Sequence, residues 1–334
     1  MILRKKRLAA IVLKPDRLYM FTPWRTYRLT RRARRQESLF KAALTYPMLG
    51  QKALIGLHPD HLEDPMLLYQ HLSRIKKTYH LWGMNATLVL PEEHFVLRTM
   101  EIPRSVEKYM TDYLQTEHKA ESIVPLQQPL FTVHVLERSD EHFRVVIHAV
   151  EKSVLDHYLT VFEALNWHIK GFLHPGMALG AWLNEDDPEQ GIIIFIQLHG
   201  VSFYVYEQRQ LIFSRFFAWE PDLIIDDVKP MMRIEHIARI TDYMMRIERF
   251  ARTTLYAEGV ILEKVYVLME REGLEEAGTS ISAELSRQLA AIDMDIATLS
   301  FNWPGSWPKP EAFGGNAPLL GADLYVASGA LRVT

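Results

Sequence analysis

Three short segments of the chain place histidines and carboxylates close enough together to suggest chemistry. Residues 58–61 (HPDH) could begin a metal site, but no further ligand pair stands at a metal-binding spacing, and Asp60 fits the entry to a helix. Residues 92–94 (EEH) fall in a predicted turn, where such groups are usually solvated. The aspartates within 222–227 precede a predicted helix and suit its positive end. None of the three segments is predicted to be catalytic or to bind a metal.

Established catalytic motifs are also missing from the sequence. It contains no G-x-S-x-G, H-E-x-x-H, Walker A or G-x-G-x-x-G pattern, and serines and histidines are scattered without a triad context. The chain has no cysteine, which excludes disulfides, thiolate metal sites and cysteine nucleophiles. These absences favour a protein that binds over an enzyme.

The composition is that of a globular protein with a sizeable core. Of 334 residues, 48% are apolar and 24% are charged. No apolar run approaches the roughly 20 residues of a membrane span, and the basic residues 4–7 are not followed by an apolar stretch typical of a secretory signal. We therefore expect a cytoplasmic protein of two or three domains.

Charge is distributed unevenly along the chain. Residues 1–41 carry a net charge of +11 and the remainder −14. The densest basic cluster consists of Arg25, Arg28, Arg31, Arg32, Arg34 and Arg35. This cluster is either a solvated surface hairpin or a site for anionic lipid head groups or an acidic partner. Nucleic acid is not expected, because the rest of the chain is acidic and carries no nucleic-acid motif.

The strongest structural signal lies between Gly191 and Phe217. Residues 192–196 (IIIFI) are continuously apolar, as in a strand buried on both faces. Alternating residues follow Gly200, and a polar turn at 207–210 leads to a third apolar run at 211–213. The pattern predicts a three-stranded meander that opens a new sheet.

The other predicted elements follow an order typical of ribonuclease-H-like units, in which strands and helices alternate after a meander. Strands are predicted at 8–13, 17–22, 53–57, 86–90, 95–102, 130–136, 143–150, 169–173 and 264–269. Helices are predicted after Asp64, after Ser105, after Ser153, at 175–183 and, the longest, at 228–258. The polar segment 184–188 is the best single domain boundary.

Several short sequence segments, taken in their order along the chain, resemble the PilM-type pilus-assembly proteins. They lie at 95–103, 123–126, 145–156, 211–215 and 327–332. The resemblance implies an α/β actin-like (ribonuclease-H-like) fold with two lobes and an inserted small α+β subdomain. The first lobe would cover 1–90, completed by 173–188 and 322–334; the insertion would cover 91–172, and the second lobe 189–321.

The resemblance also implies a partner. The family binds the cytoplasmic N-terminal tail of a bitopic inner-membrane protein (PilN-like) in a groove between the first lobe and the insertion, alongside other pilus-assembly components. The candidate groove residues are Leu97, Met100, Ile102 and Tyr113. The alternative is that these four residues are simply the core of the insertion.

The nucleotide site that the family implies is altered here. The family uses two Asp-x-Gly hairpins and a Gly-Gly loop to hold ATP. At these places the chain has Lys14-Pro15-Asp16, Gln197-Leu198-His199-Gly200 and a charged segment, 269–273. The degenerate positions are Lys14, His199, Gly200, Ser202 and Gly273. We therefore expect no cofactor; the alternative is ATP with magnesium, with Ser202 and Lys14 contacting phosphate.

These observations predict a non-enzymatic scaffold of a type IV pilus or DNA-uptake (competence) pseudopilus machine, peripheral at the inner face of the cell membrane. Two alternatives stay open. One is an ATP-dependent member of the same machinery, and the other is the actin-like cytoplasmic component of a type II secretion system.

Overall fold

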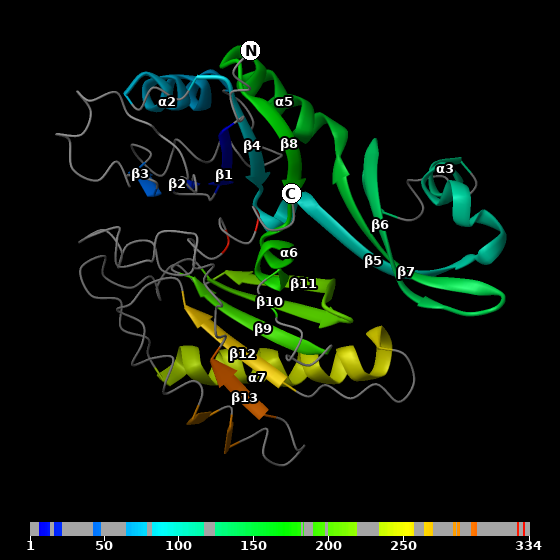
Figure 1. The fold of residues 1–334 in the computed structure, drawn as a ribbon. Coiled ribbons are helices and arrows are strands. Elements are labelled where there is room, and N and C mark those ends of the chain that lie inside the picture. Colours follow the sequence, from blue (N-terminus) through cyan, green and yellow to red (C-terminus); the bar gives the residue numbers. More distant parts are fainter. Residues whose placement is uncertain are drawn as a thin grey trace. The chain divides into compact units, whose positions relative to one another are not determined.

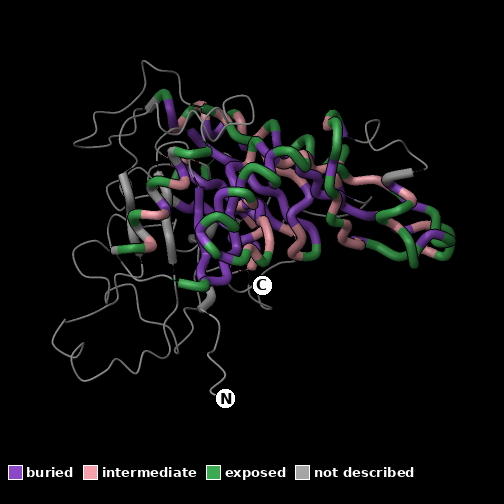
Figure 2. Tube along the Cα trace, turned by 90° about the horizontal axis from the view of Figure 1, so that it is seen from above, coloured by how far each residue is buried: buried purple, intermediate pink, exposed green. Residues whose placement is uncertain are grey.

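The computed structural model forms two compact units (Figure 1). Unit 1 comprises Met1–His94, Lys152–Trp182 and Asn302–Thr334, and unit 2 comprises Phe95–Glu151 and Leu183–Phe301. The residues whose structure is described are 7–13, 17–21, 43–47, 65–78, 82–116, 124–181, 183, 190–197, 200–218, 234–256, 264–269, 283–284, 286–287, 295–298, 326 and 330. Figure 2 marks the buried, intermediate and exposed residues of the described part of the chain, and many of the buried ones are apolar residues of its strands.

Unit 1 contains a five-stranded sheet of order β3-β2-β1-β4-β8. Its strands are β1 (Arg7–Leu13), β2 (Arg17–Phe21), β3 (Ala43–Pro47), β4 (Met84–Val89) and β8 (His168–Leu173). The first three are antiparallel, and β4 and β8 continue the sheet in parallel. All six residues of β4 are buried, as expected for a strand covered on both faces.

Three helices accompany this sheet. They are α2 (Pro65–Thr78), α5 (Lys152–Ala164) and α6 (Pro175–Gly180). Helices α2 and α5 pack against each other, and Lys76 Nζ donates to the carbonyl of Leu165 at 2.6 Å. The side chain of His174 caps α6 by accepting from the Gly176 amide at 2.9 Å.

Unit 2 repeats the same strand order in the sheet β11-β10-β9-β12-β13. The strands are β9 (Gly191–Gln197), β10 (Gly200–Glu207), β11 (Gln210–Ala218), β12 (Lys264–Met269) and β13 (Asp295–Thr298). The predicted meander is confirmed: β9, β10 and β11 are antiparallel neighbours, and β12 and β13 follow in parallel. Two lobes with one strand order confirm the actin-like fold class.

Helix α7 (Ile234–Phe250) packs on the sheet of unit 2 through an apolar stripe. Ile240, Met244 and Ile247 join the buried residues of β9 and β10 in one core, and Phe217 of β11 stacks on Tyr243, with ring centroids 3.9 Å apart. The predicted helix, 228–258, is wrong near its C-terminal end, and residues 228–233, 257 and 258 lie outside the described residues. The α-helical geometry ends at Phe250, and η6 (Ala251–Leu255) is a single π turn.

A third sheet, of order β5-β7-β6, forms the inserted subdomain. It consists of β5 (Phe95–Pro103), β6 (Pro129–Arg138) and β7 (His142–Glu151), with the short helices η4 (Arg104–Tyr109) and α3 (Met110–Thr116). The expected boundaries, 91–172, differ from the observed ones. Segment 152–173 belongs to unit 1, because β8 pairs in parallel with β4 and α5 packs on α2. Of the terminal segment expected to complete the first lobe, the structure describes Val326 and Ala330, both buried.

Candidate functional site

One face of the inserted sheet is covered by its own helices. Its buried core contains Ile102 of β5, Val106 of η4 and Leu114 of α3, together with Phe143, Val145 and Ile147 of β7. Met100 and Tyr113 are partly buried and pack against this cluster. Strand alternation explains the grouping, because Met100 and Ile102 are two residues apart and so point to the same face.

The four candidate groove residues therefore do not form one surface. Met100, Ile102 and Tyr113 lie together in the core of the subdomain, whereas Leu97 is an odd-numbered residue of β5 and points to the opposite face. Ile102 is fully buried. This placement agrees with the alternative that these residues are core, and a role in binding a partner stays a prediction.

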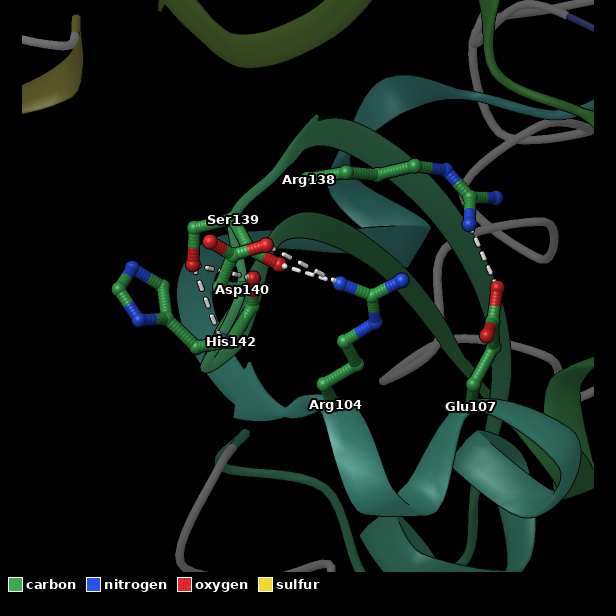
Figure 3. A network of polar contacts seen from close by, with 6 residues as sticks. All are labelled: Arg104, Glu107, Arg138, Ser139, Asp140 and His142. Atoms are coloured by element: carbon green, nitrogen blue, oxygen red, sulfur yellow. Dashed lines mark hydrogen bonds and ion pairs between the residues drawn. The ribbon is translucent and has the colours of Figure 1, made fainter.

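The outer end of the subdomain is a network of exposed charges (Figure 3). Arg138 pairs with Glu107 at 2.5 Å, and Arg104 lies 3.6 Å from Asp140. Ser139 closes the β6–β7 turn: its Oγ donates to the carbonyl of His142 at 2.8 Å and accepts from the His142 amide at 3.0 Å. Exposed pairs of this kind contribute about 0–1 kcal/mol each, so the network orients η4 against the turn more than it stabilises the fold.

The opposite face of the inserted sheet packs on the meander of unit 2 through buried polar groups. Arg144 of β7 donates to Glu207 Oε1 at 2.5 Å, and the two side chains are 12% and 4% exposed. His148 Nε2 donates to the carbonyl of Leu211 at 2.9 Å. The apolar part of this contact is made by Leu136 and Val146, which belong to the same core as β9 and β10.

Burial favours the neutral form of two histidines, His134 and His148. Desolvation lowers the pKa of His148 to about 4, against the hydrogen bond to Leu211, which raises it. The neighbouring His134 also has a lowered pKa because of burial, and its ring centroid lies 5.2 Å from that of His148. The imidazole of His148 therefore contacts β11 in its uncharged form, with the His134 ring beside it.

The β9–β10 hairpin contains Gly200 and Ser202, two of the positions at which the sequence resemblance implies an altered phosphate loop. Gln197 Nε2 donates to Ser202 Oγ at 2.8 Å, and Ser202 is fully buried. A Cβ at Gly200 would lie 2.3 Å from the Phe217 carbonyl oxygen and 2.5 Å from the Phe216 ring. Gly200 is thus required by the close approach of β11. Residues 198 and 199 of the hairpin turn lie outside the described residues, and the expected absence of a nucleotide stays a prediction.

The other predicted site residues cannot be compared with the structure. Lys14, His199, Gly273 and the six arginines between Arg25 and Arg35 lie outside the described residues. Within the described ranges, no three His, Asp or Glu side chains gather as metal ligands. No helix in the described part of the chain is long and apolar enough to cross a bilayer.

Sequence reasoning missed the buried polar contact between the insertion and the meander. The sequence predicts a polar turn at 207–210, yet Glu207 is the last residue of β10 and is buried. A signal existed in β7, where Arg144, Val146 and His148 occupy alternate positions of one face. An arginine in the middle of a strand that is predicted to be buried indicates a buried counter-charge, but not its position.

Comparison with known proteins supports the fold. No protein-family model and no curated protein sequence matches the chain. Among solved structures, a chain of the PilM–PilN type IV pilus biogenesis complex is similar over 97% of this chain and 98% of its own length, with a TM-score of 0.66 and 15% identity. The cytoplasmic domain of EpsL, from the type II secretion system of Vibrio cholerae, is similar over 79% of this chain and 82% of its own (TM-score 0.43, 14% identity). A protein of Bacteroides thetaiotaomicron with an actin-like ATPase fold is similar over 99% of this chain and 96% of its own (TM-score 0.47, 10% identity).

The class of protein is therefore defined as actin-like, with a three-stranded insertion after the fourth strand of the first lobe. Within that class, the chain is PilM-like in its fold over nearly its whole length.

Proposed function

We propose that this protein is a scaffold of a type IV pilus or DNA-uptake machine that binds the cytoplasmic tail of a bitopic, PilN-like membrane protein. The proposal is supported by the full-length similarity to a chain of a PilM–PilN complex and by the phrases at 95–103 and 145–156, which fall on β5 and on β7 with the start of α5. The same proposal places the protein at the inner face of the membrane, next to other pilus-assembly components.

The β9–β10 hairpin is the observation that favours a scaffold over an ATPase. Its glycine is covered by Phe216 and the Phe217 backbone, and its hydroxyl is paired with Gln197. A phosphate that approached Gly200 from the side of β11 would have to displace the Phe216 ring, and one that took the Ser202 hydroxyl would have to break its hydrogen bond to Gln197. The alternative, an ATP-binding member of the same machinery, is favoured by the actin-like fold.

Peptide titration tests the partner. Synthetic N-terminal tails of the bitopic membrane proteins encoded with this chain are titrated into the full protein by calorimetry, and a scrambled tail is the control. We expect one tail to bind and the scrambled tail not to bind. Failure of every tail, with the protein shown to be folded by circular dichroism, would reject the proposal.

Nucleotide titration tests the absence of ATP chemistry. Labelled ATP with magnesium is titrated into the same preparation, and we expect no binding in the micromolar range. Micromolar binding together with hydrolysis that Lys14→Ala abolishes would establish the ATPase instead.

A further inference from the structure

Arg144 is a buried cation that connects three separate segments of unit 2. It lies on β7 of the inserted subdomain. Its Nη1 donates to the carboxylate of Glu207, at the end of β10, and its Nη2 donates to the carbonyl oxygen of Leu255, at the end of η6. A guanidinium group presents its donors in a fixed planar fork, so this one side chain holds both segments in a defined relation to the insertion.

The end of α7 that Arg144 contacts is irregular. The Tyr256 amide donates to the carbonyl of Ala251 at 2.9 Å, which closes a π turn in place of an α turn. The Tyr256 hydroxyl donates to the carbonyl of Tyr206 at 3.1 Å, next to Glu207. Isolated π turns are less favourable than α-helix and persist where surrounding contacts support them. Here the supporting contacts come from Tyr206 of the meander and from Arg144 of the insertion.

The hydroxyl of Tyr256 is held as a donor by its surroundings. Burial, and then the negative charges of Glu207 and Glu248, raise the pKa of Tyr256. Glu248 is also buried, and it is paired with Arg252, which lies four residues later in η6. The π turn therefore lies between two buried carboxylates, and Arg144 from the insertion neutralises one of them.

We propose that Arg144 is a conformational latch: with the insertion docked, it holds the last turn of α7 in its π form, and displacing the insertion releases Glu207 and this turn together. The inference rests on the proposed function, because a partner bound to the insertion would supply the force that moves it. Glu207 without Arg144 is a buried unpaired carboxylate, which is strongly unfavourable, so undocking and loosening of the turn occur as one event. A signal at the insertion would then reach α7, under the sheet of the second lobe.

Hydrogen–deuterium exchange on the full-length protein tests the latch without a partner. Arg144→Met should accelerate exchange at 251–256 by more than about tenfold, since each factor of ten corresponds to about 1.4 kcal/mol of local stability. The matched control is Arg138→Met, on the neighbouring strand β6, which removes an exposed pair with Glu107 and should leave 251–256 unchanged. Unchanged exchange there in Arg144→Met would overturn the proposal.

Two milder variants keep the test decisive if Arg144→Met fails to fold. Arg144→Lys retains the charge but not the planar fork, and Glu207→Gln retains an acceptor while removing the charge. Each should accelerate exchange at 251–256 relative to Arg138→Met. Absence of acceleration in both would overturn the latch, and because no tail peptide is used, that result is independent of the peptide titration.

Discussion

Gln197 and Ser202 are diagonal neighbours across the β9–β10 hairpin, and the amide of one donates to the hydroxyl of the other at 2.8 Å. On the same face of the meander, Phe216 pairs with Ser202 across β10 and β11, and its ring lies over Gly200. The hairpin is therefore stabilised by its own side chains.

Gly200→Ala should destabilise unit 2. The added Cβ would lie 2.3 Å from a backbone oxygen, which cannot rotate away, so we expect a loss of about 1–3 kcal/mol or more in the free energy of unfolding. Urea denaturation measures it. The matched control is Gly171→Ala on β8, where no atom lies within 4 Å of the added Cβ, and there the change should stay within about 1 kcal/mol of zero. Equal stability of the two variants would contradict the packing explanation.

Stability should fall as the pH is lowered from about 6.5 towards 4. Burial lowers the pKa of His148 in the folded state to about 4, so the unfolded state binds the proton first. The contribution of neutral His148 to the free energy of unfolding is complete above the pKa of histidine in the unfolded chain, about 6.5, and is lost progressively as the pH falls below it. Since one pKa unit corresponds to about 1.36 kcal/mol, this contribution amounts to roughly 3 kcal/mol. Urea denaturation midpoints measured between pH 4 and 8 give the slope of stability against pH.

The control for the pH prediction separates His148 from the other histidines. His148→Gln keeps a side-chain N–H for the Leu211 carbonyl and should flatten the slope. His157→Gln changes an exposed histidine of α5 and should not. A slope unaltered by His148→Gln would mean that other groups dominate, with the half-buried His134 as the first candidate.

Ile102→Ala should lower the stability of the fold and should not act specifically on partner binding. Ile102 is fully buried in the core of the inserted subdomain, so truncation should cost about 2–5 kcal/mol. Leu130→Ala, at a residue that is 41% exposed on strand β6 of the same subdomain, should cost much less. Thermal unfolding of both variants checks the difference. A stable Ile102→Ala protein that has lost tail binding would instead assign Ile102 to the partner groove.

Mutating the arginine cluster should weaken attachment to anionic membranes. Each basic residue near an anionic surface is worth about 1 kcal/mol, so replacing Arg31, Arg32, Arg34 and Arg35 with Gln should reduce vesicle binding strongly. Sedimentation with phosphatidylserine-containing vesicles, at low and high salt, measures the effect. Binding that is absent in the unaltered protein, or insensitive to salt, would reject a role in lipid contact.

Local sequence pattern predicted most of the secondary structure of the regions that the structure describes, but not β3, β13 or the π turn after α7. The continuous apolar run at 192–196 became β9, the alternating residues after Gly200 became β10, and Ser139-Asp140 forms the turn between β6 and β7. These elements depend on side-chain periodicity and turn chemistry, which are properties of neighbouring residues. The order of the elements was enough to indicate the actin-like class.

Only the tertiary structure decided which of these elements belong together and which side chains meet. Arg144 and Glu207 are 63 residues apart, and the pairing depends on how the inserted sheet packs on the meander. The end of the insertion at Glu151 follows from the pairing of β8 with β4, and the need for glycine at 200 follows from β11. Buried charges, domain boundaries and close backbone contacts are long-range properties, so one sequence read locally leaves them open.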